Sequence, residues 1–271
     1  MTLHTRNRVM TGVLVFSLLA VCSIGILAFY SISHQIFRFP SGDSFGAVSL
    51  FYFAAPYSFP AVLISICFLT VSVPVITGLM MAHFAKTQSQ ECLYFALFLL
   101  ACLTESIRLF IPFLGLWKSN ASFLITSTRI FFFGRLLAPA SFLFSSIFSI
   151  VGQTQGSERN SGVLFAVTGV IALLIPVNTT RILPNCTVGI GFIPFFWVYE
   201  LTLAVLTFVS LLLEAQNNGP ERKRLAMGFL LLFTGYILLI QTLSMFSLAL
   251  GIIFFASGVY LYLVNLHQTY L

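Results

Sequence analysis

Four ionisable residues stand inside long apolar stretches of this sequence. Glu105 and Arg108 share one stretch, Arg135 lies in a second and Glu200 in a third. A charged side chain at the centre of a membrane-spanning helix costs about 2.5–3.5 kcal/mol on insertion scales, so it needs a partner or a polar cavity. Because two acids and two bases can neutralise one another, we expect these four side chains to lie together.

The expected depth of these residues supports a common site. A rise of ~1.5 Å per residue, counted from the end of each stretch, places all four in the outer half of a hydrocarbon core ~30 Å thick. Three further polar residues are expected near the same level, namely Asn178, Tyr199 and Gln241. Three interpretations remain open: a structural ion-pair network, an outward-facing pocket for a small charged or zwitterionic ligand, and a proton or ion path.

Both arginines of this set occur in the same local pattern, R-L-x-x-P, which ends at Pro112 for Arg108 and at Pro139 for Arg135. Proline lacks the N–H that would bond the carbonyl four residues earlier. Each arginine is therefore expected where its helix leaves a carbonyl free, and helices broken at membrane depth are tolerated where they line protein or a water-filled cavity.

The composition identifies the class of protein that must position these residues. Of 271 residues, 59% are hydrophobic and 7% are charged, against about 25% charged in soluble domains, so soluble classes are excluded. The net charge of +6 does not indicate nucleic-acid binding, because the one basic run, Arg222-Lys223-Arg224, lies beside a predicted span, where such runs set topology. No cofactor, metal or enzymatic activity is expected, since no Cys/His cluster or buried His/Ser or His/Asp pair is found.

Eight apolar segments can be drawn, each near the ~20 residues that one crossing requires. Their length excludes barrel strands, and we expect an all-α polytopic membrane bundle of about eight helices, one N-terminal anchor and seven more. The charge-free run 225–265 is divided at 241–244 because it is about twice the length of one crossing. The segments are residues 9–30, 57–81, 92–112, 127–151, 162–178, 191–213, 225–244 and 246–265.

The predicted organisation has four parts. Residues 1–30 form a basic segment and an uncleaved signal anchor, 31–56 an outer loop, 57–265 the seven-helix bundle and 266–271 a short tail. Most loop Lys and Arg residues fall on one side, which places both termini in the cytoplasm. The expected inner residues are Arg6, Arg8, Lys86, Arg159, Arg222, Lys223 and Arg224, and the outer ones Arg38, Lys118 and Arg181.

Residues 86–108, KTQSQECLYFALFLLACLTESIR, carry a resemblance to a known family. The segment resembles the charged loop and following helix of bacterial seven-transmembrane receptors with diverse intracellular signalling modules, with Tyr94, residues 96–100 and Arg108 at matching places. The resemblance implies seven spans over 57–265 after the anchor, in a bacterial inner membrane. Family members usually carry an outer sensing domain and a cytoplasmic output domain. Their absence here implies a bare sensor or scaffold that needs a separate partner.

These observations lead to a function hypothesis with one alternative. We expect a small-ligand or envelope sensor, or an assembly subunit, that sits in the lipid bilayer and meets a cytoplasmic signalling or assembly protein. The partner would bind at Lys86, Arg159, Arg222, Lys223 and Arg224. The alternative is a small transporter or permease that uses kinked helices and the same charged residues.

Overall fold

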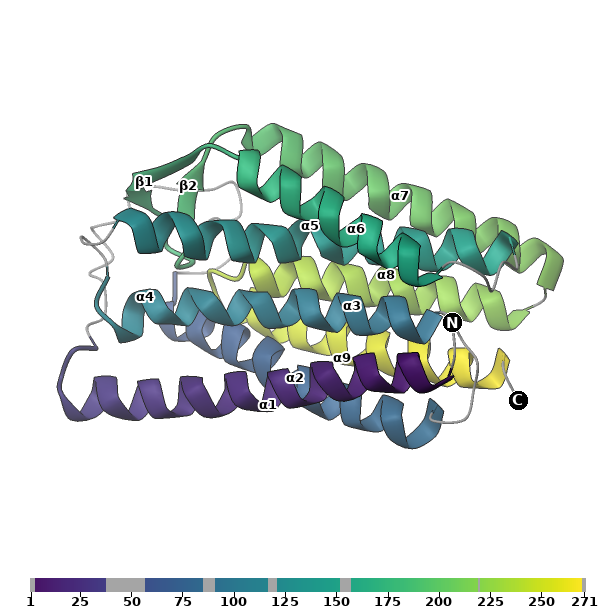
Figure 1. The fold of residues 1–271 in the computed structure, drawn as a ribbon, viewed down its shortest axis with the longest axis horizontal. Coiled ribbons are helices and arrows are strands. Elements are labelled where there is room, and N and C mark those ends of the chain that lie inside the picture. The colour runs from purple at the N-terminus through teal and green to yellow at the C-terminus, as the bar shows by residue number, and fades with distance from the viewer. Residues whose placement is uncertain are drawn as a thin grey trace.

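A computed structural model describes residues 3–37, 57–84, 91–116, 121–151, 157–218 and 220–269. The described chain is a bundle of long helices with one short β-hairpin (Figure 1). The elements are α1 (Leu3–Ser33), α2 (Phe59–Phe84), α3 (Glu91–Thr104), the 3-10 helix η3 (Glu105–Leu109), α4 (Phe110–Phe113), α5 (Ala121–Val151), α6 (Ser157–Leu174), β1 (Val177–Ile182), β2 (Val188–Ile190), α7 (Ile193–Asn218), α8 (Pro220–Ile240) and α9 (Met245–Thr269).

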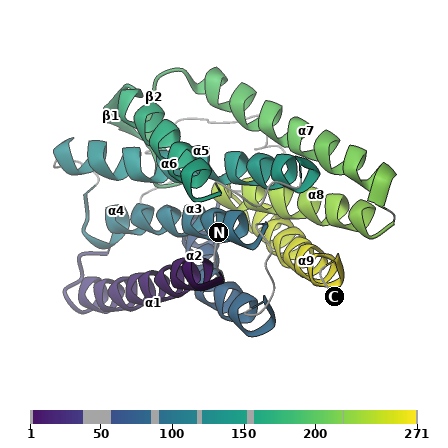
Figure 2. The same ribbon diagram turned by 45° about the vertical axis from the view of Figure 1, so that its right-hand side comes forward.

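The two ends of the bundle differ. Both chain termini, the end of α7 and the start of α8 lie at one end, which we call the termini end, on the right of Figure 1. The β-hairpin and α4 lie at the other, the hairpin end. In both views α3 lies between α1 and α5 (Figure 2), and it packs on both of them. The helix that carries Glu105 and Arg108 therefore runs through the middle of the molecule.

The helices suit a membrane. Seven helices of the described chain are long and apolar enough to cross a bilayer: α1, α2, α5, α7, α8, α9 and the unit formed by α3, η3 and α4. The apolar part of α6, Arg159–Leu174, is shorter. Large apolar side chains on α1 and α7, such as Phe16 and Leu201, are exposed as lipid-facing side chains would be. An all-α, multi-pass membrane bundle is the class of fold that these helices support.

The structure corrects the predicted fifth segment, 162–178. Helix α6 ends at Leu174, Pro176 follows, and Val177–Ile182 is a strand paired with Val188–Ile190. The physical reasons are local, because a proline disfavours helix in the residue before it and the β-branched residues Val177, Thr179 and Thr180 favour a strand. Asn178 therefore lies on β1, and the expectation that it belongs to a membrane helix is wrong.

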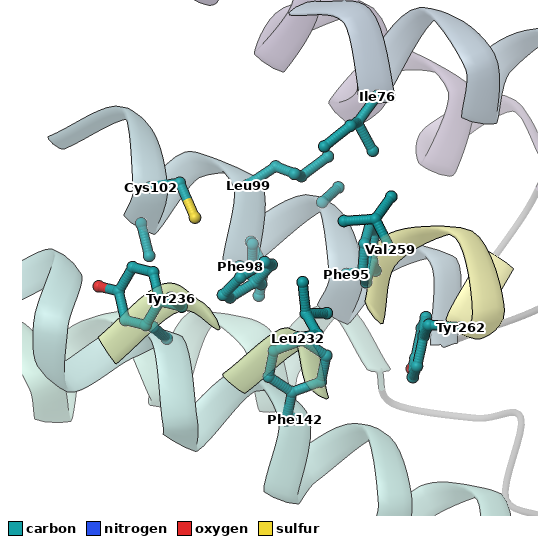
Figure 3. Packing of buried hydrophobic residues seen from close by; sticks show 14 of the residues in the cluster. Ile76, Phe95, Phe98, Leu99, Cys102, Phe142, Leu232, Tyr236, Val259 and Tyr262 are labelled. Carbon is teal, nitrogen blue, oxygen red and sulfur yellow. The ribbon is translucent and has the colours of Figure 1, made fainter. Parts of the chain in front are cut away.

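Aromatic side chains fill the centre of the bundle beside α3 (Figure 3). The rings of Phe95 and Tyr262 stack with centroids 5.1 Å apart, and the rings of Phe98 and Phe142 lie 4.6 Å apart. These residues come from α3, α5 and α9, so one cluster joins elements distant in sequence. Such rings contribute through buried area and through their mutual geometry.

Glycines set the closest helix contacts. A Cβ on Gly235 of α8 would lie 2.7 Å from the Cα of Phe255, and one on Gly258 of α9 would lie 2.8 Å from the Cβ of Leu232. Small residues let helix backbones approach in a membrane. Helices α8 and α9 are thus a tightly packed antiparallel pair, divided at residues 241–244, where the sequence analysis divides the same run.

Candidate functional site

The buried charges lie where α3 changes its winding. From Glu105 to Leu109 the chain forms the 3-10 helix η3, just before Pro112. In a 3-10 helix, side chains at i and i+3 lie above one another. The Nη1 of Arg108 accordingly lies 2.7 Å from Oε2 of Glu105, although the two residues are nearly free of solvent contact. Proline at position 112 and the 3-10 turn together place this ion pair inside the bundle.

Arg135 of α5 completes the group. Its Nε donates to Oε1 of Glu105 at 2.7 Å and its Nη2 donates to Oε2 at 3.2 Å. The guanidinium also lies over the rings of Phe131 and Phe132, 5.1 and 5.6 Å from their centroids. We call Glu105, Arg108 and Arg135 the hairpin-side network. One carboxylate pairs with two arginines, so the formal charge of the whole network is +1.

A small-residue contact brings Arg135 to Glu105. Gly134 and Thr104 precede these two residues, and Gly134 faces the α3 backbone so closely that an added Cβ would lie 2.8 Å from the carbonyl oxygen of Ala101. No side chain larger than hydrogen fits there without moving α5. The spacing between α3 and α5, and hence the Arg135–Glu105 bond, depends on this glycine.

Arg108 binds two further segments. Its Nη1 donates to the carbonyl of Ile240, the last residue of α8, at 3.2 Å. The final carbonyls of a helix lack intrahelical donors and carry partial negative charge. Its Nε donates to the carbonyl of Asn185 at 3.1 Å, and its Nη2 donates to the same oxygen. Arg108 thus joins η3, α8 and the β-hairpin.

The end of the β-hairpin is seated in the bundle. Residues 183–187, which we call the hairpin tip, place Cys186 fully buried against an apolar cluster that includes Phe59 and Leu109. The hydroxyl of Tyr57 donates to the carbonyl of Pro184 at 3.0 Å. Burial raises the pKa of the Cys186 thiol to about 12, although the positive charge of Arg108 acts in the opposite direction. The tip is therefore a well-packed cover at the hairpin end.

The other predicted site residues take different places. Glu200 of α7 is buried and interacts electrostatically with Arg135, but it forms no direct ion pair in the described part of the chain. Tyr199 donates its hydroxyl to the carbonyl of Leu136 at 3.0 Å and so holds α7 against α5. Gln241 directly follows the residue that Arg108 contacts, whereas Asn178 is exposed on β1. The structure thus brings Glu105, Arg108 and Arg135 into contact and places Glu200 near them.

A second charged group lies at the termini end. The Nη1 of Arg222 is 2.8 Å from Oε1 of Glu91, and its Nε is 3.2 Å from Oε1 of Glu214. All three side chains are buried. This termini-side network joins the start of α3, the end of α7 and the start of α8. The sequence analysis missed it, although both acids stand at the ends of apolar segments on the predicted inner side.

The termini-side network removes Arg222 from the predicted partner surface. Arg222 is buried in ion pairs, so its guanidinium is not presented to a partner in this structure. Lys223 and Arg224 are exposed, as is Arg159 at the start of α6. Lys86 lies outside the described residues. Among those residues, no three His, Cys, Asp or Glu side chains lie together in a way that could hold a metal ion.

The comparisons with known proteins add no relationship. No protein-family model matches the chain, and no curated protein is significantly similar to it in sequence.

Proposed function

We propose that this multi-pass membrane protein senses a change at its hairpin end and relays it to a protein partner at its termini end. The observation that carries the proposal is that one span, formed by α3, η3 and α4, takes part in both charged networks. Glu91 is its first residue, and Glu105 follows 14 residues later, ~21 Å along the axis at ~1.5 Å per residue. A single buried helix therefore connects the two ends.

Helix α8 also contacts both charged networks. Its Arg222 pairs with Glu91 at the termini end, and its last carbonyl, on Ile240, accepts from Arg108 at the hairpin end. The continuous helix α3–η3 and helix α8 are thus cross-linked at both ends by polar contacts. Coupling between distant sites needs elements that both sites bias, and a shift of α3 along α8 would alter both cross-links together. This frame supports a relay.

The termini end offers a surface for the partner. Lys223 and Arg224 are exposed beside buried Arg222, and Arg159 is exposed on α6. Exposed basic side chains favour an acidic partner through long-range attraction. A change in the Arg222 ion pairs would move these neighbouring side chains directly.

The test measures whether the two ends move together. Exposed Cys22 and partly exposed Cys67 are replaced by Ser, and spin labels are placed at Lys223→Cys and Arg159→Cys in nanodisc-embedded protein. We expect the distance distribution between the labels to change in two variants, Arg108→Gln and Tyr57→Phe. Arg108→Gln leaves the Glu105–Arg135 pair electrically balanced, and Tyr57→Phe removes only the hydroxyl that bonds to Pro184. The matched control is Tyr260→Phe, at an exposed site on α9. Unchanged distributions in both variants would refute the relay.

A transporter is the second candidate, and one observation favours it. The helix that carries Glu105 is interrupted by η3 at the buried charges, and interrupted helices bind substrates in many transporters. Proteoliposomes that contain this chain alone and a panel of labelled amino acids and carboxylates test it. Uptake above empty liposomes that is lost in Glu105→Gln would favour transport over sensing.

A further inference from the structure

We infer that Arg108 is the binding residue for a small carboxylate ligand, and that the hairpin tip occupies this position until the ligand displaces it. The inference rests on the proposed function, because it names the ligand class of the same site.

The hydrogen bonds of Arg108 leave its fork incompletely matched. The Nε and Nη2 groups both donate to one neutral carbonyl oxygen, that of Asn185. This edge of a guanidinium fits the two oxygens of a carboxylate, with one N–H to each, and such bidentate pairs are stronger than bonds to a neutral acceptor. The Asn185 carbonyl thus stands where a carboxylate would bind better.

The charges nearby favour an anion at this edge. Within the described chain, the carboxylate that pairs with Arg108 is that of Glu105, which contacts Nη1 of the guanidinium. The same carboxylate also pairs with Arg135. Glu200 acts on Arg135. The edge of Arg108 that faces the tip therefore has no negative charge of its own, and a ligand carboxylate would supply one.

The seating of the tip is compatible with release. The tip is the connection of a two-stranded hairpin, and its polar ties to the bundle include the Arg108 bonds and the Tyr57 bond to Pro184. Cys186 has a φ of 58°, a left-handed conformation that residues with a Cβ rarely adopt. Withdrawal of the tip would relax this residue and vacate the space that a small ligand needs.

Cys186 is a native reporter of this displacement. In a Cys22→Ser, Cys67→Ser background, the thiols that remain at Cys92, Cys102 and Cys186 are buried. Nanodisc-embedded protein is treated with N-ethylmaleimide in sodium acetate, succinate or glutamate, and in chloride or sulfate of matched ionic strength. Intact mass and peptide mapping give the labelling rate of Cys186, and Cys186→Ala identifies the background.

We expect at least one carboxylate to raise the rate by roughly tenfold or more, as a ligand with strong preference for the open state would, while chloride and sulfate do not. Arg108→Gln should label quickly in every salt. Tyr57→Phe retains all the charges and removes the hydroxyl that bonds to the tip, so it should respond at lower carboxylate concentration than the parent protein.

Three results would overturn the inference: no carboxylate response in either the parent or Tyr57→Phe, an equal response to sulfate, or a carboxylate response that persists in Arg108→Gln. The spin-label distance at the termini end is measured in parallel, in the same salts, on protein that carries the labels at Lys223→Cys and Arg159→Cys and is not treated with N-ethylmaleimide. If carboxylate exposes Cys186 but that distance stays fixed, the relay fails and the ligand class stands. If Arg108→Gln alters the distance while no carboxylate exposes Cys186, the ligand class fails and the relay stands.

Discussion

The guanidinium of Arg108 donates twice to the backbone carbonyl of Asn185, which lies 77 positions later in the chain. This contact ties a buried charge near the end of a membrane-spanning helix to the hairpin that lies at the same end of the bundle. Because Arg108 also contacts the end of α8, the hairpin cannot move far without disturbing three elements.

Glu105 is expected to be the most important member of the hairpin-side network for stability. Glu105→Gln would remove the carboxylate that forms ion pairs with both buried arginines, and the loss of one partner of a buried pair costs about 3–5 kcal/mol. Arg135→Gln should cost less, since Glu105 still pairs with Arg108. Thermal unfolding in detergent measures both variants. Equal stability of Glu105→Gln and the parent protein would contradict a structural role for the ion pairs.

The glycine contacts give a prediction with an internal control. Gly134→Ala and Gly235→Ala insert a methyl group where backbone atoms already lie within 2.8 Å, so each should lower stability by about 1–3 kcal/mol through overpacking. Gly78→Ala on α2 meets nothing within 4 Å and should be neutral or slightly stabilising. The apparent melting temperatures of the three variants, compared in one detergent, test the helix packing. If Gly78→Ala lowered the melting temperature as much as the other two variants, the close glycine contacts would not explain the loss of stability.

Much of this architecture could be predicted from the sequence. Long apolar runs gave the helices, and the division at 241–244 agrees with the turn between Ile240 and Met245. The sequence groups Glu105, Arg108, Arg135 and Glu200, because unpaired charges are costly at membrane depth and depth can be counted along a helix. The first three are in contact in the structure, whereas Glu200 acts on Arg135 at longer range. Such reasoning needs only composition and the helical rise.

The remainder depends on tertiary contacts that leave no periodic signal. The bond from Arg108 to Asn185 depends on how the hairpin folds back. The predicted helical segment 162–178 runs past Pro176 to Asn178, because the residues before Pro176 are apolar. The pairing of Arg222 with Glu91 spans 131 positions. Basic residues at a span boundary usually set topology, so the sequence favoured an exposed Arg222 over a buried one.

Thiol reactivity should report the seating of the tip through its pH dependence. Burial raises the pKa of Cys186 from 9.0 to about 12, and the thiolate is the reactive form. Between pH 7 and 9 labelling should therefore rise with pH, yet remain far slower than at a cysteine introduced at exposed Lys223. Denaturation in SDS should remove the difference. Equal rates at the two cysteines in the folded protein would show that the tip is not buried.

The two kinds of basic residue at the termini end should behave differently. Arg222→Gln leaves Glu91 and Glu214 without their shared arginine, so we expect a loss of stability of about 3–5 kcal/mol. Lys223→Gln and Arg224→Gln are surface changes and should stay within about 0.5 kcal/mol of the parent protein. If the exposed pair contacts an acidic partner, these two variants should weaken its binding, more so at low salt. Unfolding midpoints and binding titrations with a defined partner check both parts.

The two charged networks are expected to be energetically coupled, because the continuous helix α3–η3 and helix α8 connect them. Arg108 and Arg222 contact opposite ends of the same two helices, and mutations at sites without shared partners usually add within about 0.3–0.5 kcal/mol. If α3 and α8 move as a unit, Arg108→Gln should already loosen the Arg222–Glu91 contact, so the double variant should be less destabilised than the sum of the single ones. A double-mutant cycle measured by reversible unfolding gives this difference. The pair Arg108→Gln and Gly78→Ala serves as the control, since Gly78 contacts neither network. Strict additivity of the arginine pair would mean that the networks stabilise each end separately and that the helices between them carry no signal.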